Sequence, residues 1–293
     1  MKLTIFTPSY NRRELLKNLY LSIVTNVSRL SNDDCVEWLI VDDGSTQDYS
    51  KIISSFISTE RLAITYFKKQ NGGKHTAFNY AIEKCNGDLF VCVDDDDSLL
   101  PLAINQFFYY GRLYQNTNYG AFVGRVVDEK GSLLGKSLKN ETIVSNTLEI
   151  RDKYKYWGEP EIYFVSKLKQ FRFSVFNQEK FLTEAFLFDD MSIKYPFVYL
   201  QKPFMVKKYL PGGLTDNQLK IRIESPVGTT NYYLKRQKQC KGLANIKARI
   251  NKIRFNFWVT DNVVFKISFF DVLLFPIAFI FYLHDKVKYK KNK

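Results

Sequence analysis

Short apolar runs alternate with stretches of helical periodicity over residues 1–115 of this 293-residue chain. The pattern predicts strands at 3–7, 38–41, 62–67 and 89–93, helices at 15–24, 49–57 and 76–84, and a further helix opened by Pro101. Strands that alternate with helices build a mostly parallel sheet with helices on both faces. Polar residues end each run, and open α/β sheets bind ligands at the carboxyl ends of their strands. We therefore expect a Rossmann-like α/β fold with a site at that edge.

The pattern changes from Tyr119 onward. Residues 121–127 predict a strand, and residues 128–131 predict a turn that leads to a partner strand. Strands and helices rich in aromatic residues continue to about residue 225, and we interpret them as a second lobe of the same domain. The expected organisation is one domain in two halves, followed by a tail: 1–115, 116–225 and 226–293.

Cysteine and histidine usage excludes two classes of protein. The four cysteines stand far apart without a Cys-x-x-Cys pair, and the chain has only two histidines. A disulfide scaffold and a structural zinc site are therefore not expected, and we interpret the cysteines as buried thiols in a reducing compartment. The apolar stretch at the N-terminus is stopped by Pro8, well short of a signal-peptide core, so we expect a cytoplasmic protein.

The tail carries most of the excess charge. The chain has a formal net charge of +13, of which residues 235–293 contribute +11, from 14 lysines and arginines against three aspartates. Residues 263–283 are apolar but are interrupted by Lys266, Asp271 and Pro276. The cleaner run 272–283 would reach only ~18 Å as a helix, against about 30 Å for a bilayer core. We expect a helical segment that lies on an anionic membrane surface; the alternative is a core helix with a solvated basic end.

Four consecutive aspartates, Asp94 to Asp97, follow the predicted strand at 89–93. Neighbouring like charges repel, so they cost stability unless a cation or hydrogen bonds compensate. Mg²⁺ and Mn²⁺ take carboxylate oxygens and leave positions open for water and phosphate. Asp94 and Asp96 are two apart and would point to the same side if strand geometry persists. The alternative is a solvated acidic turn, with Asp97 capping the next helix.

Two further polar segments follow predicted strands. The segment Asp42-Asp43-Gly44-Ser45 suits a ligand site, and equally a turn with a helix cap. In Gly72-Gly73-Lys74 the glycines let the backbone approach a ligand and the lysine suits a phosphate, although a glycine turn with a surface lysine is the commoner meaning. The chain has no Walker A loop and no G-x-G-x-x-G, which argues against triphosphate hydrolysis and a dinucleotide cofactor.

The order of these segments resembles the family 2 glycosyltransferases of the GT-A fold. The segments that carry the resemblance are TPSYNR (7–12), VDDGS (41–45), GGKHTAFN (72–79) and DDDD (94–97). The match covers roughly residues 1–115, the expected nucleotide-sugar-binding half. Beyond it, 179–184 and 209–215 are similar to the acceptor half of bacterial members.

The resemblance implies a donor site. Pro8, Tyr10 and Arg12 would lie beside the nucleotide base and ribose, and Asp43 would accept a hydrogen bond from the base. Lys74 would sit near the diphosphate or the sugar.

The resemblance also assigns the acidic run. Asp94 and Asp96 form the Asp-x-Asp pair that would hold the nucleotide sugar through Mn²⁺ or Mg²⁺. Asp95 is assigned to donor binding with Asp94, and Asp97 is a catalytic candidate that would contact the sugar or a group around the metal.

Family 2 enzymes invert the anomeric centre in one displacement, which needs a general base for the acceptor hydroxyl. Glu184 falls where the family often has an acidic residue before a helix, so it is the predicted base. Family members frequently have Glu-Asp at this point, whereas this chain has Glu184-Ala185. Asp189 and Asp190 are the alternative bases, and Glu184 would then be an ordinary surface carboxylate.

Aromatic residues near 154–157 are candidates for an acceptor groove. Tyr154, Tyr156 and Trp157 offer faces that stack on sugar rings, although core packing is the alternative for each of them.

The resemblance implies a metal-dependent, hexosyltransferase-like enzyme that moves a sugar from a nucleotide sugar, expected to be UDP-linked. The acceptor would be a glycan or a polyprenyl-linked saccharide in bacterial cell-surface polysaccharide synthesis, at the inner face of the cell membrane. A nucleotidyltransferase is disfavoured because residues 7–12 replace its glycine-rich loop. A non-enzymatic protein that binds anionic membranes or nucleic acid would leave the strand-end carboxylates without a purpose, and nucleic acid is not an expected partner.

Overall fold

The computed structural model describes residues 1–30, 33–138, 140–156, 158–176, 178–208, 217–260 and 268–291. Four predicted features lie outside these residues: Trp157, the segment 209–215, the start of the apolar run at 263–267, and Lys293. The chain forms two compact units. Unit 1 comprises Met1–Gly72, Thr76–Arg172 and Leu187–Leu210, and unit 2 comprises Gly73–His75, Phe173–Phe186 and Pro211–Lys293. The division at residues 115 and 225 stays a prediction.

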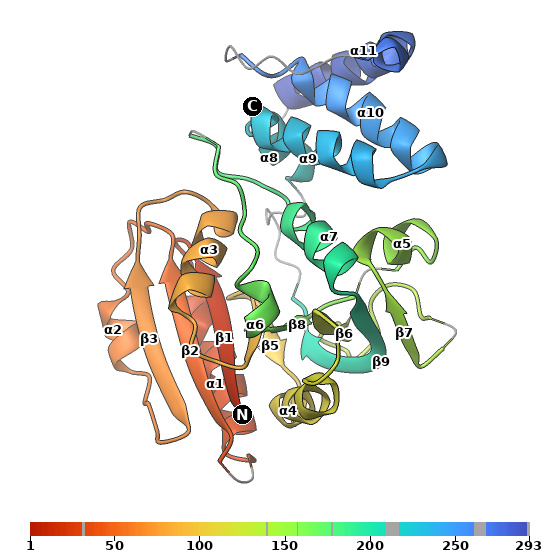
Figure 1. The fold of residues 1–293 in the computed structure, drawn as a ribbon. Helices are drawn as coiled ribbons and strands as arrows, with labels where there is room; N and C mark the ends of the chain where they lie inside the picture. The colour runs from red at the N-terminus through yellow and green to blue at the C-terminus, as the bar shows by residue number, and fades with distance from the viewer. Residues whose placement is uncertain are drawn as a thin grey trace. The chain divides into compact units, whose positions relative to one another are not determined.

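Unit 1 is built on a nine-stranded sheet of order β3-β2-β1-β4-β8-β6-β9-β5, with β7 paired to β9 (Figure 1). The strands are β1 Lys2–Ser9, β2 Cys35–Asp42, β3 Leu62–Lys68, β4 Leu89–Cys92, β5 Ser98–Leu99, β6 Ala121–Val127, β7 Thr142–Ser145, β8 Glu161–Phe164 and β9 Phe197–Val206. Strands β1 to β4 are parallel: β1 pairs with β2 and with β4, and β2 pairs with β3. Strand β8 runs antiparallel to β4 and β6, and β6 is parallel to β9. The four strands predicted from the first 93 residues are confirmed.

The helices of the first half follow the predicted order. They are η1 Arg13–Leu15, α1 Leu16–Val27, α2 Ser50–Ser54, α3 Lys74–Lys84 and α4 Ala103–Tyr114. Helix α2 is shorter than the apolar pattern predicted, and Ile57 at the end of that pattern is 69% exposed. Helix α4 begins two residues after Pro101, because Leu102 takes a left-handed conformation with φ of 66°. The predicted start at Pro101 is therefore wrong.

Helices cover both faces of the parallel strands, as predicted. Side chains of a strand alternate between faces, so Leu3 and Ile5 of β1 join the core that includes residues of α1, α2 and α4. Phe6 lies on the opposite face, where its ring contacts Phe78 of α3 at 5.4 Å and Phe90 of β4 at 5.9 Å. The central strands are thus covered on both faces, and the candidate site lies at their carboxyl ends.

The predicted turn after β6 is present, but the described residues 132–138 beyond it form no strand, in contrast to the prediction. Gly131 has a φ of +81°, and its N–H donates to the carbonyl of Asp128 at 2.9 Å. Beyond the turn a single bridge joins Val127 to Leu133. Strand β8 covers only Ala121–Val123 of β6. At the end of β6, the segment after the turn is joined by that bridge and by the hydrogen bond from the N–H of Leu134 to the carbonyl of Val126 at 3.0 Å.

The cysteines agree with the expected thiol chemistry only in part. None of the four forms a disulfide; Cys85 and Cys240 are buried, whereas Cys35 and Cys92 are half-buried. The prediction of buried thiols is therefore confirmed for two of them.

The remaining helices of the chain are α5 Thr147–Asp152, α6 Val165–Leu168, α7 Ala185–Lys194, α8 Gln218–Ile223, α9 Pro226–Gln239, α10 Gly242–Asn256 and α11 Phe269–Lys291. In unit 2, α10 packs against both α9 and α11. The Glu179 carboxylate accepts hydrogen bonds from the N–H groups of Val227 and Gly228 at the start of α9, both at 2.6 Å. Among the described residues, no helix combines the length and the apolar character required to cross a membrane.

Candidate donor and metal site

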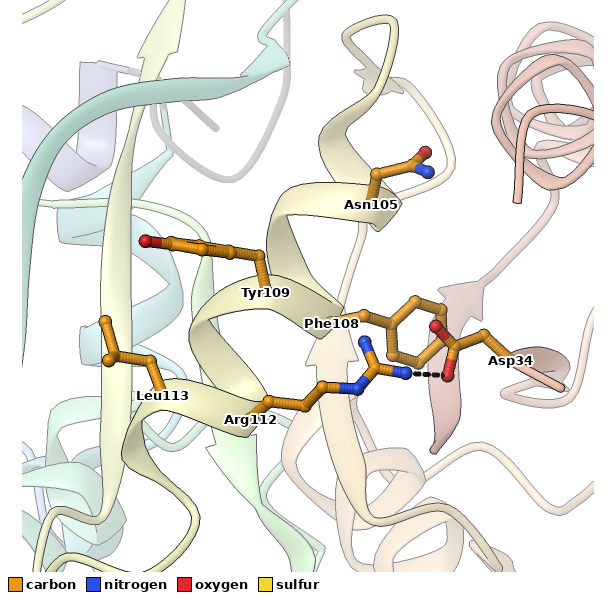
Figure 2. Close-up of a pocket in the computed structure, with 6 residues that line it drawn as sticks. All are labelled: Asp34, Asn105, Phe108, Tyr109, Arg112 and Leu113. Atoms are coloured by element: carbon orange, nitrogen blue, oxygen red, sulfur yellow. Dashed lines mark hydrogen bonds and ion pairs between the residues drawn. The ribbon is translucent and has the colours of Figure 1, made fainter. Parts of the chain in front are cut away.

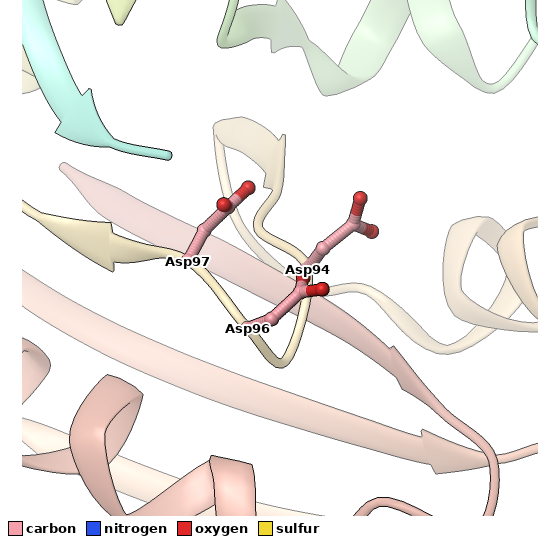
Figure 3. Close-up of side chains that lie close together, drawn as sticks. All are labelled: Asp94, Asp96 and Asp97. Atoms are coloured by element: carbon pink, nitrogen blue, oxygen red, sulfur yellow. The ribbon is translucent and has the colours of Figure 1, made fainter. Parts of the chain in front are cut away.

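The acidic run forms a compact cluster at the end of β4. Carboxylate oxygens of Asp94, Asp96 and Asp97 all lie within 4.8 Å of one another (Figure 3). A turn makes this possible, since the N–H of Asp97 donates to the carbonyl of Asp94 at 3.1 Å. Strand geometry therefore does not persist through the run, and the turn, rather than alternation along a strand, gathers the carboxylates.

Burial makes two of these carboxylates hard to ionise. Asp97 is 4% exposed, and its burial, with the charges of Asp94 and Asp96, raises its pKa to about 8 despite the opposing charge of Lys207. Burial also raises the pKa of Asp95 to about 6, against the hydrogen bond from Ser9. The backbone N–H of Lys208 donates to Asp97 at 3.3 Å, so Asp97 does not cap α4, which begins without a side-chain cap. The negative charge of the cluster is thus only partly compensated, and a cation would supply the rest.

Arg12 is the basic side chain that reaches the acidic run from the end of β1. Its Nη1 lies 3.0 Å from Oδ2 of Asp96 and 3.4 Å from Oδ1 of Asp95. The family resemblance implies a place for Arg12 beside the nucleotide base and ribose, and in this structure its guanidinium contacts the carboxylates of Asp95 and Asp96. Arg12 therefore competes with any cation for Asp96.

Two hydroxyl groups that the sequence analysis did not select connect the strand ends. Ser9 Oγ donates to Oδ2 of Asp95 at 2.8 Å and lies 2.9 Å from the Tyr49 hydroxyl. The Tyr49 hydroxyl also accepts the N–H of Arg12 at 3.0 Å. Tyr49 begins the segment 49–57 whose apolar periodicity predicts a helix, and such a pattern gives no signal for a hydroxyl group.

The two aspartates at the end of β2, Asp42 and Asp43, have different hydrogen-bond partners. Asp42 is fully buried and accepts hydrogen bonds from the N–H of Ser45 and the hydroxyl of Tyr66, both at 2.7 Å. This closes the turn that the alternative interpretation described. Asp43 instead accepts from Nζ of Lys69 at 2.7 Å and from the N–H of Gly72 at 3.0 Å. Asp43 thus ties the loop after β2 to the loop after β3.

Lys69 is a site residue that sequence reasoning missed. A usable signal was its position, because it directly follows β3 and so belongs to the same carboxyl edge as the other polar residues. Gly44 permits the close approach of the two loops: its φ is +81°, and a Cβ there would lie 2.6 Å from the backbone nitrogen of Asn71. Only glycine meets both conditions without strain.

Pro8 and Tyr10 lie at this edge, as the sequence implied. Pro8 pairs in register with Val41, and Ser9 pairs with Asp42. Tyr10 follows directly and is 48% exposed. The strand ends of β1, β2 and β4 therefore bring together the unit 1 side chains assigned to the donor.

Two predicted residues meet in unit 2. Nζ of Lys74, the first residue of α3, lies 2.8 Å from Oε1 of Glu184. Glu184 directly precedes α7, as expected of the predicted base, and its side chain is 48% exposed. Gly73 beside Lys74 has a φ of +88°, and a Cβ there would lie 1.8 Å from the carbonyl oxygen of Lys180. Glycine at this position therefore lets the Lys74 segment approach the segment that carries Glu184.

The alternative base Asp189 is buried and bound by neighbouring side chains of the fold. It is 1% exposed, forms an ion pair with Arg151 and accepts a hydrogen bond from the Thr147 hydroxyl at 2.5 Å. A base for an incoming hydroxyl must be reachable, which argues against Asp189. Asp190 is half-buried.

The aromatic candidates separate by burial. Tyr156 is 1% exposed and packs edge-on against Tyr199, with the Arg125 guanidinium over its ring. It is therefore a core residue, and its interpretation as a sugar platform is wrong. Tyr154 is 37% exposed.

A separate hollow of about 410 Å³ lies along α4 (Figure 2). Its lining residues are Asp34, Asn105, Phe108, Tyr109, Arg112 and Leu113. Asp34 precedes β2 and pairs with Arg112 at 2.5 Å. The hollow is thus at the amino end of β2, whereas ligands of open α/β sheets bind beyond the carboxyl ends of the strands.

The sheet and its acid-lined edge define a GT-A-like α/β fold. A family model gives the chain its place within this class: it belongs to glycosyl transferase family 2, whose model matches residues 4–192.

Curated relatives cover parts of the chain. A GalNAc(5)-diNAcBac-PP-undecaprenol beta-1,3-glucosyltransferase of Campylobacter jejuni is 26% identical over 216 residues, which are 70% of this chain and 64% of the relative. An uncharacterised glycosyltransferase of Mycoplasma pneumoniae is 32% identical over 108 residues, which are 36% of this chain and 35% of the relative. The chain thus spans between about a third and just under two thirds of the length of these relatives.

Solved structures share the fold at low identity. Staphylococcus aureus TarS, residues 1–349, superposes with a TM-score of 0.59 and 17% identity, covering 97% of this chain and 80% of that chain. The mannosyltransferase PcManGT of Pyrobaculum calidifontis, in complex with GDP-Man and Mn²⁺, has a TM-score of 0.52 and 15% identity, covering 98% and 83%. These likenesses confirm the predicted GT-A fold.

Proposed function

We propose that this chain transfers a hexose from a UDP-sugar to a polyprenyl-linked saccharide or growing glycan in cell-surface polysaccharide synthesis, at the inner face of the cell membrane. Family membership supports sugar transfer in general. The Campylobacter relative, named for an undecaprenol-linked acceptor, supports the acceptor class. TarS, solved with UDP and with UDP-GlcNAc, supports the donor.

The observation that carries the proposal is the convergence of acidic and basic side chains at one edge of the unit 1 sheet. Asp94, Asp96 and Asp97 gather within 4.8 Å after β4. Asp43 and Lys69 join the loops after β2 and β3 at the same edge. A diphosphate, a divalent cation and a nucleoside are the ligands that such a set of groups suits.

The residues present fit a divalent cation. All the oxygens of the cluster belong to carboxylates, which are the ligands that Mg²⁺ and Mn²⁺ prefer. Burial and, after it, the charges of Asp94 and Asp96 raise the pKa of Asp97, and a bound cation would favour its ionised form. Asp94 and Asp96 would hold the ion with Asp97 beside them, and the ion would supply charge stabilisation for the departing diphosphate.

In the proposed reaction the oxygen of the acceptor hydroxyl attacks the anomeric carbon. The bond between that carbon and the diphosphate oxygen breaks, and its electron pair leaves with the nucleoside diphosphate. The hydroxyl proton passes to the carboxylate of Glu184, which the ion pair with Lys74 holds in place. Attack from the face opposite the leaving group inverts the anomeric centre.

Thermal unfolding with UDP, GDP or CDP, each with Mn²⁺, Mg²⁺ or EDTA, tests the donor site. A ligand at 100 times its dissociation constant stabilises a fold by ~2.7 kcal/mol. We expect UDP with Mn²⁺ to raise the unfolding midpoint and EDTA to cancel the gain. Asp96→Ala is the matched control, in which UDP with Mn²⁺ should no longer act.

The outcomes separate the competing functions. If GDP is the one nucleotide that raises the unfolding midpoint, the proposed donor becomes a GDP-sugar instead of a UDP-sugar. If no nucleotide acts under any condition, the donor site is refuted, and a non-enzymatic membrane-binding protein takes its place. Nucleotidyl transfer predicts release of pyrophosphate from a nucleoside triphosphate, which we expect to be absent.

A further inference from the structure

One narrow stripe of α11 is buried or half-buried in the fold. Its members recur at steps of three and four residues: Asp271, Leu274, Ala278, Tyr282, Asp285 and Tyr289. This spacing marks a single face of a helix. Helix α10 packs along α11, and the rings of Phe257 and Trp258 after α10 contact Tyr282 at 5.0 and 5.2 Å.

Two buried aspartates hold this stripe against α10. Asp271 contacts Nζ of Lys252 at 2.6 Å and Nη1 of Arg249 at 3.0 Å. Asp285 receives Nη2 of Arg254 at 2.7 Å and its Nε at 2.5 Å. Moving α11 away from α10 into a bilayer would carry these carboxylates into hydrocarbon without their basic partners, which is costly. The contacts therefore fix which face of α11 points outward.

The outward surface of α11 is apolar over most of its length. We call it the apolar face of α11, and its members are 40 to 76% exposed: Phe269, Phe270, Val272, Leu273, Phe275, Ile277, Phe279, Ile280, Phe281 and Leu283. In this stretch the one charged residue, Asp271, belongs to the buried stripe. Soluble proteins rarely leave a continuous apolar surface of this kind in water, and such surfaces mark interaction sites.

Basic residues continue from the apolar face. Lys286, Lys288 and Lys290 are exposed on the last turns of α11. Residues 235–293 carry +11 in total, so a second copy of the chain would bring like charges together. An anionic lipid surface instead complements this charge, at about 1 kcal/mol for each basic residue near it.

We propose that α11 docks this enzyme on an anionic lipid surface, lying flat with its apolar face among the acyl chains and its last turns among the headgroups. The helix does not cross the bilayer, because the ion pairs of Asp271 and Asp285 keep it bound to α10. This deepens the proposed function, and its meaning for catalysis rests on that function. It names both the element that meets the membrane and its orientation.

Sedimentation with vesicles tests the proposal on the full chain. The vesicles are an equal mixture of phosphatidylglycerol and phosphatidylcholine, or phosphatidylcholine alone. We expect the protein to pellet with the anionic vesicles and to be released by alkaline carbonate, as a surface-bound helix is. Replacing Lys286, Lys288 and Lys290 by Gln should weaken binding by about fivefold per charge.

A matched pair of triple variants isolates the apolar face. Phe270→Glu, Leu273→Glu and Ile280→Glu change side chains that are 65, 61 and 66% exposed, and should reduce pelleting at least tenfold. Leu21→Glu, Ile57→Glu and Val175→Glu change side chains that are 61, 69 and 64% exposed, and should leave it unchanged. Equal loss in both variants would overturn the proposal, as would a wild-type chain that never pellets.

Two further readouts complete the test. Resistance to carbonate would show a spanning helix and overturn the flat orientation. A dimer in analytical ultracentrifugation that the first triple variant dissolves, without vesicle binding, would assign the apolar face to a second copy. The UDP-induced unfolding shift, measured on the same variants, separates this proposal from the proposed function, because it should be identical in all of them.

Discussion

The two units handle buried aspartates in opposite ways. In unit 1, Asp97 lies beside Asp94 and Asp96, and burial raises its pKa to about 8. In unit 2, Asp271 is equally buried, yet hydrogen bonds from Lys252 and Ser268 outweigh burial and lower its pKa to about 2. The comparison separates an acid whose charge basic side chains of the fold stabilise, Asp271, from an acid of the cluster that the proposed function assigns to a bound cation, Asp97.

Removing a ligand-binding acid should give the largest effect. Asp96→Ala is expected to reduce sugar transfer by a factor on the order of 10² to 10³, because the charge on the leaving diphosphate loses its stabilisation. The unfolding midpoint without ligand should not fall, since repulsion within the cluster decreases. Transfer assays check the first expectation and thermal unfolding checks the second. Glu83→Ala, which removes an exposed acid of the same unit, is the control. Unchanged transfer would refute the metal assignment.

Removing a compensating base should act on stability instead. Lys252→Met leaves the buried carboxylate of Asp271 with Arg249 as its remaining basic partner, and should cost about 3 kcal/mol, the low end for a broken buried pair. Combining Lys252→Met with Asp271→Leu should restore most of the loss, because the buried carboxylate is then gone as well. Urea unfolding measures both. A double variant as unstable as the single one would show that packing, not charge, matters here.

The two units should respond to pH with opposite signs. Because the folded pKa of Asp271 lies below its unfolded value, its contribution of about 2 kcal/mol is present above pH 4 and is lost as the pH falls from about 4 to 2. The folded pKa of Asp97 is raised, so this carboxyl costs stability progressively as the pH rises from about 4 to 8.

Urea unfolding in EDTA at pH 2.5, 5 and 8 measures the difference. Asp271→Asn should destabilise at pH 5 much more than at pH 2.5. Asp97→Asn should stabilise at pH 8 more than at pH 5. Parallel pH profiles for the two variants would contradict the comparison.

The smallest effect should come from the guanidinium at the boundary of the acidic run. Arg12 contacts Asp96 at 3.0 Å, so Arg12→Ala removes a competitor for that carboxylate. We expect Mn²⁺ to bind the variant a few-fold more tightly in calorimetry without nucleotide. Arg13→Ala, next in the chain, is the control and should leave Mn²⁺ affinity as it is. Weaker Mn²⁺ binding to Arg12→Ala would mean that Arg12 supports the metal site instead of competing with it.

Local patterns were enough for the parallel half of the fold. The four strands and the order of the helices follow from periodicity, because each element has its own apolar pattern within ten or so residues. The predicted start of α4 was wrong because the left-handed conformation of Leu102 delays the helix. The predicted length of α2 was wrong because the helix ends at Ser54 and leaves Ile57 exposed. The predicted partner strand after β6 is reduced to an isolated bridge between Val127 and Leu133, and the long-range neighbours of β6 are β8 and β9, which no local pattern predicts.

The sequence by itself determined that carboxylates follow β2 and β4 at one edge of a parallel sheet, because chain order and strand direction place them there. Only the tertiary structure decided their partners: Arg12 with Asp96, Lys69 with Asp43, and Lys74 with Glu184. The same holds for α11, whose apolar run did not reveal that Asp271 and Asp285 bind α10 and turn the apolar face outward. These ion pairs join residues that are far apart in the sequence, so the periodicity of apolar residues does not predict them.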